Sequence, residues 1–292
     1  IYISGKIVLG GHTMKIITKS LIQDFKVYLT EEEHSESTVD KYIRDLNFLK
    51  KWLGENELTK NIILKYKQKL CEQYAPASVN SIISSLNSFF TYTGWHEVKI
   101  RTLKIQKRIF SNKEKELSKH EYIRLLNAAN SGKNQRLSYL MQTICSTGIR
   151  VSELKFITVE SLKTRAANIN CKGKIRTVFL PKKLCKMLKD YCVKNNIKKG
   201  AIFISKNGKP LDRSNIWTAM KKLCGTAMVA KEKVFPHNLR HLFARTYYSI
   251  QKDVVRLADI LGHSSVNTTR IYTIETGEVH RRQIEKLGFL RC

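Results

Sequence analysis

The sequence predicts a mainly α-helical protein with two domains: an all-helical domain, then an α-rich domain that carries one small β-sheet. Three observations lead to this fold class. Apolar residues recur every three to four positions from residue 19 to 94, which is the helical period. A basic stretch at 98–115 breaks this pattern, and residues 166–180 alternate as paired strands do. A length of 292 residues suits two modest domains.

Four helices are expected in the first domain, residues 14–97. Ser20 and Ser37 are the predicted N-caps of the first two helices. Pro76 suits the first turn of the fourth helix, and Gly94 ends it. The apolar stripe of the third helix consists of Ile62, Ile63, Tyr66 and Leu70. These stripes are most simply interpreted as a hydrophobic core.

Residues 1–13 are expected to be a non-native or disordered leader. They lack a helical period and the order of segments that defines a signal peptide, and the first methionine is Met14. Gly10 and Gly11 stand where a translated ribosome-binding sequence would lie. The hypothesis is therefore that residues 1–13 are translated upstream DNA.

Residues 98–116 are expected to form an extended basic linker between the domains. From 98 to 115 the sequence contains seven Lys or Arg and one Glu. A basic linker can follow a phosphate backbone, whereas the simpler alternative is a solvated surface strand. The candidate DNA-binding residues of this linker are Lys99, Arg101, Lys104, Lys107 and Arg108.

The second domain is expected at residues 117–292. Ser118 is the predicted cap of its first helix, a second helix runs from Leu137 to Cys145, and Pro181 opens another. A hairpin turns at Gly173, and its alternating apolar residues are Ala167, Ile169, Cys171, Ile175, Val178 and Leu180. A short strand is expected at 201–204. Further helices are expected at about 213–224, 237–250, 253–261, 265–272 and 278–287.

The charge balance predicts an anionic partner. Lys and Arg number 53 against 24 Asp and Glu, which gives a formal net charge of +29. Because each neutralised phosphate releases counterions, nucleic acid is the expected partner, and a merely soluble basic protein is the alternative. Hydrophobic residues make up 42% of the chain, which is enough to build cores and excludes a disordered polycation.

The cysteines and the hydropathy indicate in which compartment the protein is expected. Seven scattered cysteines without a Cys-x-x-Cys pair disfavour a disulfide framework and a structural zinc site, and favour a reducing, cytoplasmic location. No stretch reaches the ~20 consecutive apolar residues of a membrane span, so no membrane partner is expected.

Two segments in the first half of the second domain carry candidate site residues. Gly148 at an expected helix end is followed closely by Arg150, and Glu153 can reach back to orient that guanidinium. Lys172 stands beside Gly173 at the hairpin turn. Taken singly, both are also typical of ordinary helix junctions and solvated turns.

A third segment, Pro236 to His241, contains a histidine that could transfer a proton and an arginine that could bind a phosphate. His237 and Arg240 lie three residues apart on one helical face. Histidine can move a proton near neutral pH, and arginine can bind two phosphate oxygens. A zinc pair of His237 and His241 is a weaker alternative, because Asn238 stands where a zinc hydrolase needs its Glu.

A fourth segment, LGHSSVNTTRIYT, places Gly262 at a helix end and Tyr272 about two turns into the next helix. Alone, Tyr272 would be interpreted as a core aromatic residue and His263 as a capping residue. In the order Arg…Lys…His-x-x-Arg…Leu-Gly-His…Tyr, the four segments resemble the tyrosine recombinase (phage integrase) family, including Xer-type and mobile-element integrases. GIRVSEL, HNLRH and LADILGHSSVNTTRIY match its best-marked segments, and the resemblance covers roughly residues 17–290.

The resemblance implies a fold and an activity. The fold is an N-terminal, SAM-like, helical core-binding domain followed by an α-rich catalytic domain with a small sheet. The activity is site-specific cutting and rejoining of double-stranded DNA, without ATP, metal ion or other cofactor. The sequence is consistent with this, since it has no phosphate-binding Gly-rich loop followed by Lys-Ser/Thr and no carboxylate cluster suited to two metal ions.

The resemblance also implies a role for each site residue. Tyr272 would attack the phosphorus to form a 3′-phosphotyrosyl link, and Arg150 and Arg240 would clamp the phosphate oxygens. His237 would accept the proton of the tyrosine, and Lys172 would protonate the leaving 5′-oxygen.

Two further residues would support this set. His263 would hydrogen-bond the phosphate, and Glu153 would hold Arg150 in place.

The resemblance further implies a tetramer on DNA. The candidate assembly element is the segment after Tyr272, whose apolar residues are Val279, Ile284, Leu287 and Phe289. Its alternative is to fold back on its own domain. Two other functions stay open at this point: DNA relaxation of the type IB topoisomerase kind, and DNA-binding regulation with an unused active site.

Overall fold

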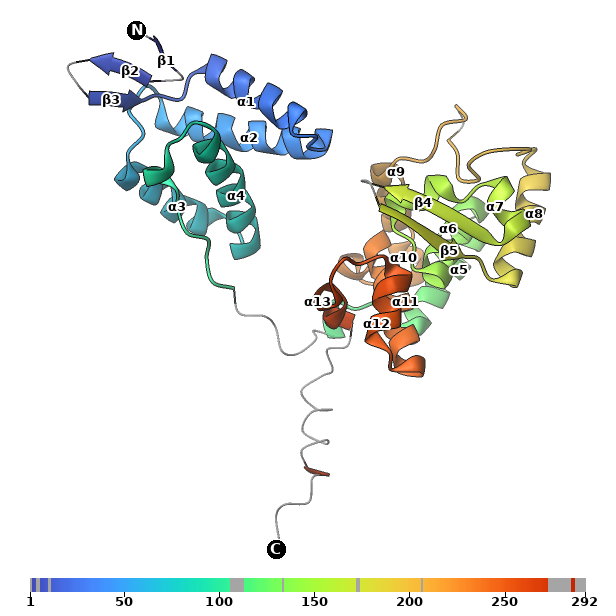
Figure 1. The fold of residues 1–292 in the computed structure, drawn as a ribbon. Coiled ribbons are helices and arrows are strands. Elements are labelled where there is room, and N and C mark those ends of the chain that lie inside the picture. Colours follow the sequence, from blue (N-terminus) through green and yellow to red (C-terminus); the bar gives the residue numbers. More distant parts are fainter. Residues whose placement is uncertain are drawn as a thin grey trace, which may run out of the picture. The chain divides into compact units, whose positions relative to one another are not determined.

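The chain divides into two compact units, Ile1–Lys107 and Arg108–Cys292 (Figure 1). The computed structural model describes residues 2–3, 6–9, 12–105, 113–132, 134–171, 174–205, 207–272 and 285–286. Both units are mainly helical, and the second carries a two-stranded antiparallel sheet. The predicted fold class is confirmed.

The first unit contains the four predicted helices, α1 (Lys19–Glu31), α2 (Glu36–Leu53), α3 (Lys60–Gln73) and α4 (Pro76–Tyr92), followed by the 3₁₀ turn η1 (His96–Val98). Thr18 and Ser35 are the N-caps of α1 and α2, two residues before the predicted Ser20 and Ser37. Pro76 occupies the first turn of α4 as predicted. Gly94 has a φ of +71° just beyond its end, a conformation that glycine adopts without strain.

Aromatic rings form the centre of the first unit. Phe25, Phe89, Phe90 and Trp95 have no exposed surface. The rings of Phe25 and Trp95 each meet Phe89 edge to face, with centroids 5.3 and 5.8 Å apart. Because large rings bury much apolar area in a well-defined geometry, this cluster packs α1 against α4 and the start of η1.

The first part of the expected linker packs on the first unit instead of lying free. Val98 and Ile100 are buried, so the alternation of apolar and polar residues in this stretch reflects packing against the core of the first unit. The side-chain amide of Asn87 donates to the Ile100 carbonyl at 2.8 Å and accepts from the Ile100 amide at 3.0 Å. Asn80 holds Leu103 by the same pair of bonds, at 2.9 and 2.7 Å. These amide side chains satisfy backbone groups that have no strand partner.

The residues expected as a disordered leader include three short strands, β1 (Tyr2–Ile3), β2 (Lys6–Leu9) and β3 (His12–Lys15). They pair antiparallel in the order β1-β2-β3, with Ile7 opposite Met14. The described strand residues of this segment thus have extended backbone. The expectation that residues 1–13 are a non-native or disordered leader stays a prediction.

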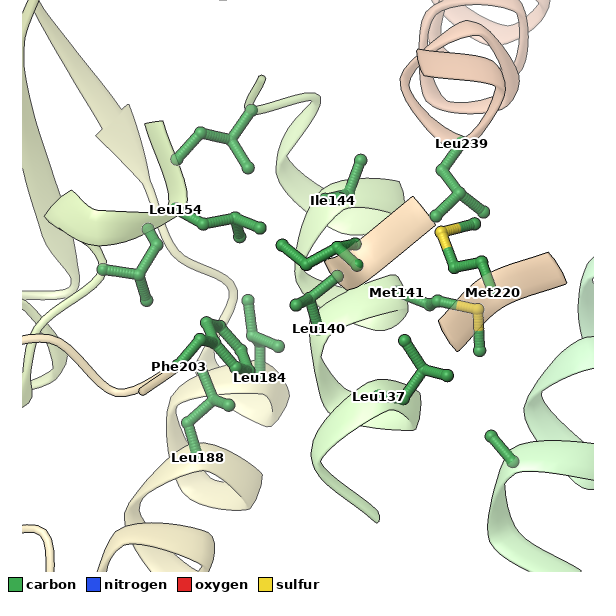
Figure 2. Packing of buried hydrophobic residues seen from close by; sticks show 14 of the residues in the cluster. Leu137, Leu140, Met141, Ile144, Leu154, Leu184, Leu188, Phe203, Met220 and Leu239 are labelled. Atoms are coloured by element: carbon green, nitrogen blue, oxygen red, sulfur yellow. The ribbon is translucent and has the colours of Figure 1, made fainter. Parts of the chain in front are cut away.

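The second unit runs through η2 (Lys113–Lys115), α5 (Lys119–Ser131), α6 (Gln135–Thr147), η3 (Val151–Phe156), α7 (Val159–Thr164), β4 (Ala166–Cys171), β5 (Lys174–Phe179), α8 (Lys182–Lys194), α9 (Arg213–Lys222), α10 (Cys224–Ala227), η4 (Lys231–Lys233), α11 (Pro236–Gln251), α12 (Val254–Leu261), α13 (Val266–Thr269) and η5 (Arg270–Tyr272). Helix α6 is its central element and packs against α5, α8, α9 and α11. Figure 2 shows the buried face of α6, from Leu137 to Ile144, among apolar residues of the surrounding elements.

Three predicted elements of the second unit differ in the structure. Residues 201–204 make only isolated bridges, Thr158 with Ala201 and Ile204 with Pro210, because their backbone groups bond to loop residues rather than to a strand. The helix expected at 213–224 ends at Lys222, and α10 follows it. The helix expected at 265–272 is split into α13 and η5.

The hairpin corrects the predicted pattern of buried residues. Its strands pair with Ile169 opposite Arg176 and Ala167 opposite Val178, and Ala167, Ile169 and Val178 are buried. Ile175, expected on the apolar face, is 76% exposed. Because side chains alternate between the two faces of a strand, Arg176 takes the inward position beside Val178.

Two predicted features lie outside the described residues: the hairpin turn at Lys172 and Gly173, and most of the helix expected at 278–287. Within the described part of the chain, no helix is long and apolar enough to cross a membrane.

Candidate active site

The end of helix α12 is the centre of the candidate active site. Arginines donate to three successive carbonyl oxygens there: Arg176 to Ile260 at 2.7 Å, Arg240 to Leu261 at 2.7 Å, and Arg150 to Gly262 at 3.2 Å. The last carbonyls of a helix have no partner within the helix and carry partial negative charge, so they attract cations. Gly262, with a φ of +64°, ends α12 and turns the chain toward His263.

One buried carboxylate organises two of these arginines. Glu153, whose side chain is 3% exposed, accepts from Nη1 of Arg150 at 2.8 Å and from Nη2 of Arg176 at 2.6 Å. Its Oε2 also accepts from the backbone amide of Arg150 at 3.0 Å. Burial opposes the charge of Glu153, but hydrogen bonds from Arg150 and both guanidiniums lower its pKa overall. The predicted contact of Glu153 with Arg150 is therefore present in the structure.

Arg240 is the most buried of the three arginines, with 1% of its surface exposed. Its Nη1 donates to Gly148 O at 2.6 Å, and Nη2 donates to Leu261 O. Burial lowers the pKa of Arg240 to about 10, and the charge of Arg150 adds to this. The guanidinium stays protonated at neutral pH, and within the described structure its Nε–H has no hydrogen-bond partner.

Tyr272 lies beside Arg240 rather than in a separate core. Tyr272 is 4% exposed, and its side chain lies close enough to Arg240 to oppose the lowering of the guanidinium's pKa. The ring stands edge to face with His241, at a centroid distance of 4.8 Å, and nearly parallel to His263 at 6.1 Å. The tyrosine hydroxyl and the buried guanidinium therefore belong to one site within a single chain.

His263 is held by hydrogen bonds at both ring nitrogens. Nδ1 is 2.8 Å from Thr269 Oγ1, and Nε2 is 3.0 Å from Nη2 of Arg240. Since the guanidinium can only donate, Nε2 is the acceptor and Nδ1 carries the hydrogen. Burial and then Arg240 and Arg150 lower the pKa of His263 to about 4, so the ring is neutral. In this tautomer Nε2 has no hydrogen to donate, and the bond from His263 to a phosphate stays a prediction.

His237 stands at the mouth of a cavity of about 280 Å³. The residue as a whole is exposed, but its ring is partly desolvated, and this burial and the charges of Arg240, Arg150 and Arg213 lower its pKa. The ring is therefore a neutral proton acceptor at pH 7. The cavity is lined by Ile149, Arg150, Val151, Ser152, Arg213, Trp217, Phe235, Pro236, His237 and Arg240.

The remaining predicted residues are placed only in part. Lys172, Lys107 and Arg108 lie outside the described residues. Arg101 and Lys104 are exposed on the first unit and Lys99 is half-buried. The rings of His237 and His241 pack edge to face at 4.7 Å, and no group of three His, Cys, Asp or Glu among the described residues could hold a metal ion.

Comparison with known proteins identifies the family. Residues 115–278 match the phage integrase family, and residues 22–97 match the phage integrase N-terminal SAM-like domain. The chain belongs to the phage integrase family. The predicted resemblance, including its enzyme class of tyrosine recombinase, is thereby confirmed.

Similar proteins include several Xer recombinases. Tyrosine recombinase XerA of Pyrococcus furiosus is 28% identical over 94% of this chain and 96% of its own length. XerD of Vibrio cholerae is 27% identical over 82% of this chain and 86% of its own length. A lambda integrase dimer bound to a COC′ core site has the same fold, with a TM-score of 0.72, 18% identity, and coverage of 89% of this chain and 96% of the other.

In this integrase-family chain, the fold brings to the site three residues that the sequence motifs did not indicate, together with His241, which the motifs indicated only as a zinc ligand. Arg176 reaches it from β5, His241 packs against the tyrosine, and Arg213 and Trp217 line the cavity from α9. A strict two-residue alternation from Val178 would have placed Arg176 inward. Arg213 and Trp217 lie four residues apart, which is the spacing of one helical face.

Proposed function

We propose that this chain is a site-specific DNA recombinase that cuts and rejoins strands through a 3′-phosphotyrosyl intermediate at Tyr272. The single observation that supports this most is the convergence of Tyr272, Arg240 and Arg150 on the end of α12. A phenolic nucleophile beside two guanidiniums suits attack on a phosphodiester, because the cations stabilise charge that grows on the phosphate oxygens.

Cleavage requires a bond at phosphorus to form as another breaks. The tyrosine oxygen binds the phosphorus, the bond to the 5′-oxygen breaks, and a free 5′-hydroxyl leaves. A free tyrosine loses its proton only near pH ~10, so the reaction needs a base. His237, with its lowered pKa, accepts that proton in the proposal. Lys172 supplies a proton to the 5′-oxygen.

Rejoining is the reverse reaction with a different 5′-hydroxyl. The phosphotyrosyl ester retains the energy of the broken bond, so ATP is not required. Arg150 and Arg240 supply the positive charge that other phosphoryl-transfer enzymes take from metal ions. The proposed enzyme therefore works without a cofactor. We place its action in the cytoplasm.

Strand exchange needs two DNA sites and, in this proposal, four copies of the chain. A lambda integrase structure described as a tetramer bound to a Holliday junction shares the fold at a TM-score of 0.71. In the second unit, an apolar cavity of about 520 Å³ lies among α5, α6, α8 and α11. Its lining includes Tyr122, Leu184, Met187, Leu242 and Phe243. We propose it as the receptor for the C-terminal segment of a neighbouring copy.

A selection from random DNA tests the nucleophile without knowledge of the target. The chain is incubated with duplexes that carry a 40-base-pair random core and one nick, and DNA that stays attached after heating in detergent is sequenced. We expect one motif to be enriched with wild-type protein and no attached DNA with Tyr272→Phe, at equal binding of the intact duplex. Adducts formed by Tyr272→Phe would exclude Tyr272 as the nucleophile.

The selected DNA also separates recombination from plain relaxation. We expect strand exchange between two copies of the motif, and loss of exchange but not of cleavage when the chain ends after residue 277. Relaxation of any supercoiled plasmid, with no motif required, would instead favour a topoisomerase. Binding without any adduct would favour a regulator.

A further inference from the structure

Arg176 reaches the candidate active site from strand β5. It occupies an inward position of β5, opposite the buried Ile169, and its side chain is 15% exposed. An inward arginine in a hairpin is costly unless its charge and donors find partners. Its partners are therefore a guide to what the residue does.

Both ends of the Arg176 guanidinium are bound to the active site. Nη2 donates to Oε2 of Glu153 at 2.6 Å, and Nη1 donates to the Ile260 carbonyl at 2.7 Å. Arg176 thus connects the carboxylate that holds Arg150 to the end of α12 that holds Arg240 and Arg150. A planar guanidinium offers two donor nitrogens in a fixed geometry, whereas a lysine offers only one nitrogen from which to reach both acceptors.

The path of the side chain also depends on Gly262. A Cβ atom at Gly262 would lie 2.3 Å from Cδ of Arg176 and 2.6 Å from its Nε. The stem of Arg176 therefore passes directly over the α carbon of Gly262. The missing side chain leaves room for this arginine, and the turn that leads to His263 is packed against it.

The charges of the cluster show why a third arginine matters. A carboxylate paired with Arg150 alone would cancel the charge that should act on the phosphate. With Arg150 and Arg176 on Glu153 and Arg240 bound to nearby carbonyls, the cluster holds three guanidiniums and one carboxylate, a net charge of two positive. A phosphodiester carries one negative charge, and attack by a phenolate adds a second, so the cluster matches the charge of the transition state.

We propose that Arg176 is a positioning residue for DNA cleavage, which locks Glu153 and the end of α12 together and leaves the charge of Arg150 available to the scissile phosphate. The proposal rests on the proposed function for its catalytic part. It assigns Arg176 no contact with DNA; the residue acts through Glu153 and through the Gly262 turn.

Hydrogen exchange without DNA tests the structural part. The Arg150 amide is protected by its bond to Glu153, and Arg176→Gln should speed its exchange about tenfold or more, together with the last amides of α12. Arg136→Gln is the matched control, because Arg136 also donates to a single carbonyl, Ile204 at 2.7 Å, away from the site. Unchanged exchange at Arg150 in Arg176→Gln would overturn the proposal.

Single-turnover cleavage of the selected nicked duplex tests the catalytic part. We expect Arg176→Gln to lower the cleavage rate about 10–100-fold, with the dissociation constant for intact duplex within about threefold of wild type. Arg176→Lys should recover part of the rate, because it restores the charge but not the bridge. Arg136→Gln should cleave as wild type does.

A double variant separates charge compensation from loss of folding. If Arg176 compensates Glu153, the rate of Glu153→Gln/Arg176→Gln should be no lower than that of Glu153→Gln alone. Additive losses, or a wild-type rate in Arg176→Gln, would overturn the proposal. If wild-type protein forms no adduct while exchange at Arg150 responds to Arg176→Gln, the proposed function fails and the structural coupling stands.

Discussion

Among the described residues, each unit buries one carboxylate, and the two are built differently. In the first unit, Asp45 accepts from Lys41 at 2.6 Å and from the Ser85 hydroxyl at 2.7 Å. In the second unit, Glu153 accepts from two arginines and a backbone amide. One lysine balances Asp45, whereas Glu153 is outnumbered by cations.

The difference separates an ion pair without net charge from a cluster that keeps a positive surplus. The Asp45 pair is a local i, i+4 contact on α2 that joins α2 to α4, and its net charge is zero. The Glu153 cluster joins η3, β5 and the end of α12, and with Arg240 it keeps a positive surplus. A neutral pair stabilises a fold, while a surplus of fixed charge creates a site for an anion.

Removing each carboxylate tests this comparison most strongly. Glu153→Gln leaves Arg150 and Arg176 without a counter-charge, so we expect about 3 kcal/mol of lost stability and a cleavage rate reduced about 100-fold. Asp45→Asn should cost about 1–2 kcal/mol in the first unit and leave the cleavage rate unchanged at saturating DNA. Denaturant unfolding and single-turnover cleavage measure both. Equal slowing by the two variants would contradict the distinction.

Lowering the pH should weaken the second unit through two half-buried histidines. The pKa values of His241 and His263 are lowered to about 4, because burial and nearby cations disfavour the charged ring. Unfolded histidine binds a proton near pH ~6.5, so protons favour the unfolded state. This stability is complete above pH ~6.5 and is lost as the pH falls toward 4.

Thermal unfolding followed between pH 7 and 4.5 checks this expectation. We expect the melting temperature of the second unit to fall by about 5 °C or more, and to fall less in His241→Gln. An equal fall in the wild type and in His241→Gln would show that His241 does not contribute.

Two glycines with positive φ offer a smaller contrast. Gly262 in the second unit and Gly94 in the first have φ of +64° and +71°, and alanine at either should cost about 1 kcal/mol of backbone strain. A Cβ at Gly262 would meet Arg176, whereas nothing lies within 4 Å of one at Gly94. We therefore expect Gly262→Ala to slow cleavage about tenfold through displaced Arg176, and Gly94→Ala to leave the rate unchanged. A reduced cleavage rate in Gly94→Ala would mean that backbone strain alone affects catalysis.

The smallest expected effect concerns the segment on the first unit that carries the candidate DNA contacts. Asn87→Ala removes both bonds to Ile100, and we expect a loss of about 1 kcal/mol and faster exchange of the Ile100 amide. Binding to the selected duplex should weaken about two- to threefold, because Lys99 and Arg101 become less ordered. The cleavage rate at saturating DNA should not change. Full protection of Ile100 in the variant would contradict this account.

Local signals in the sequence predicted most helices and part of the site. Ser118 with Glu121 forms the capping box that begins α5, and Pro76 begins α4, because both act within one turn of chain. The contact of Arg150 with Glu153 was predictable for the same reason, since residues three apart on a turn are neighbours. The order of the motifs predicted the family.

Contacts between distant segments could not be predicted in this way. Arg176 is 23 residues from Glu153 and 84 from Ile260, and only the register of the hairpin and the packing of α12 bring them together. His241 reached the site because α11 turns it toward Tyr272.

The sequence by itself determined that this chain is a basic, two-domain member of the phage integrase family, because caps, helical periods and ordered motifs are local properties of the chain. The tertiary structure decided which cations share Glu153 and which carbonyls of α12 they bind. Burial and electrostatic balance depend on everything that surrounds a group, and that surrounding exists only in the folded protein.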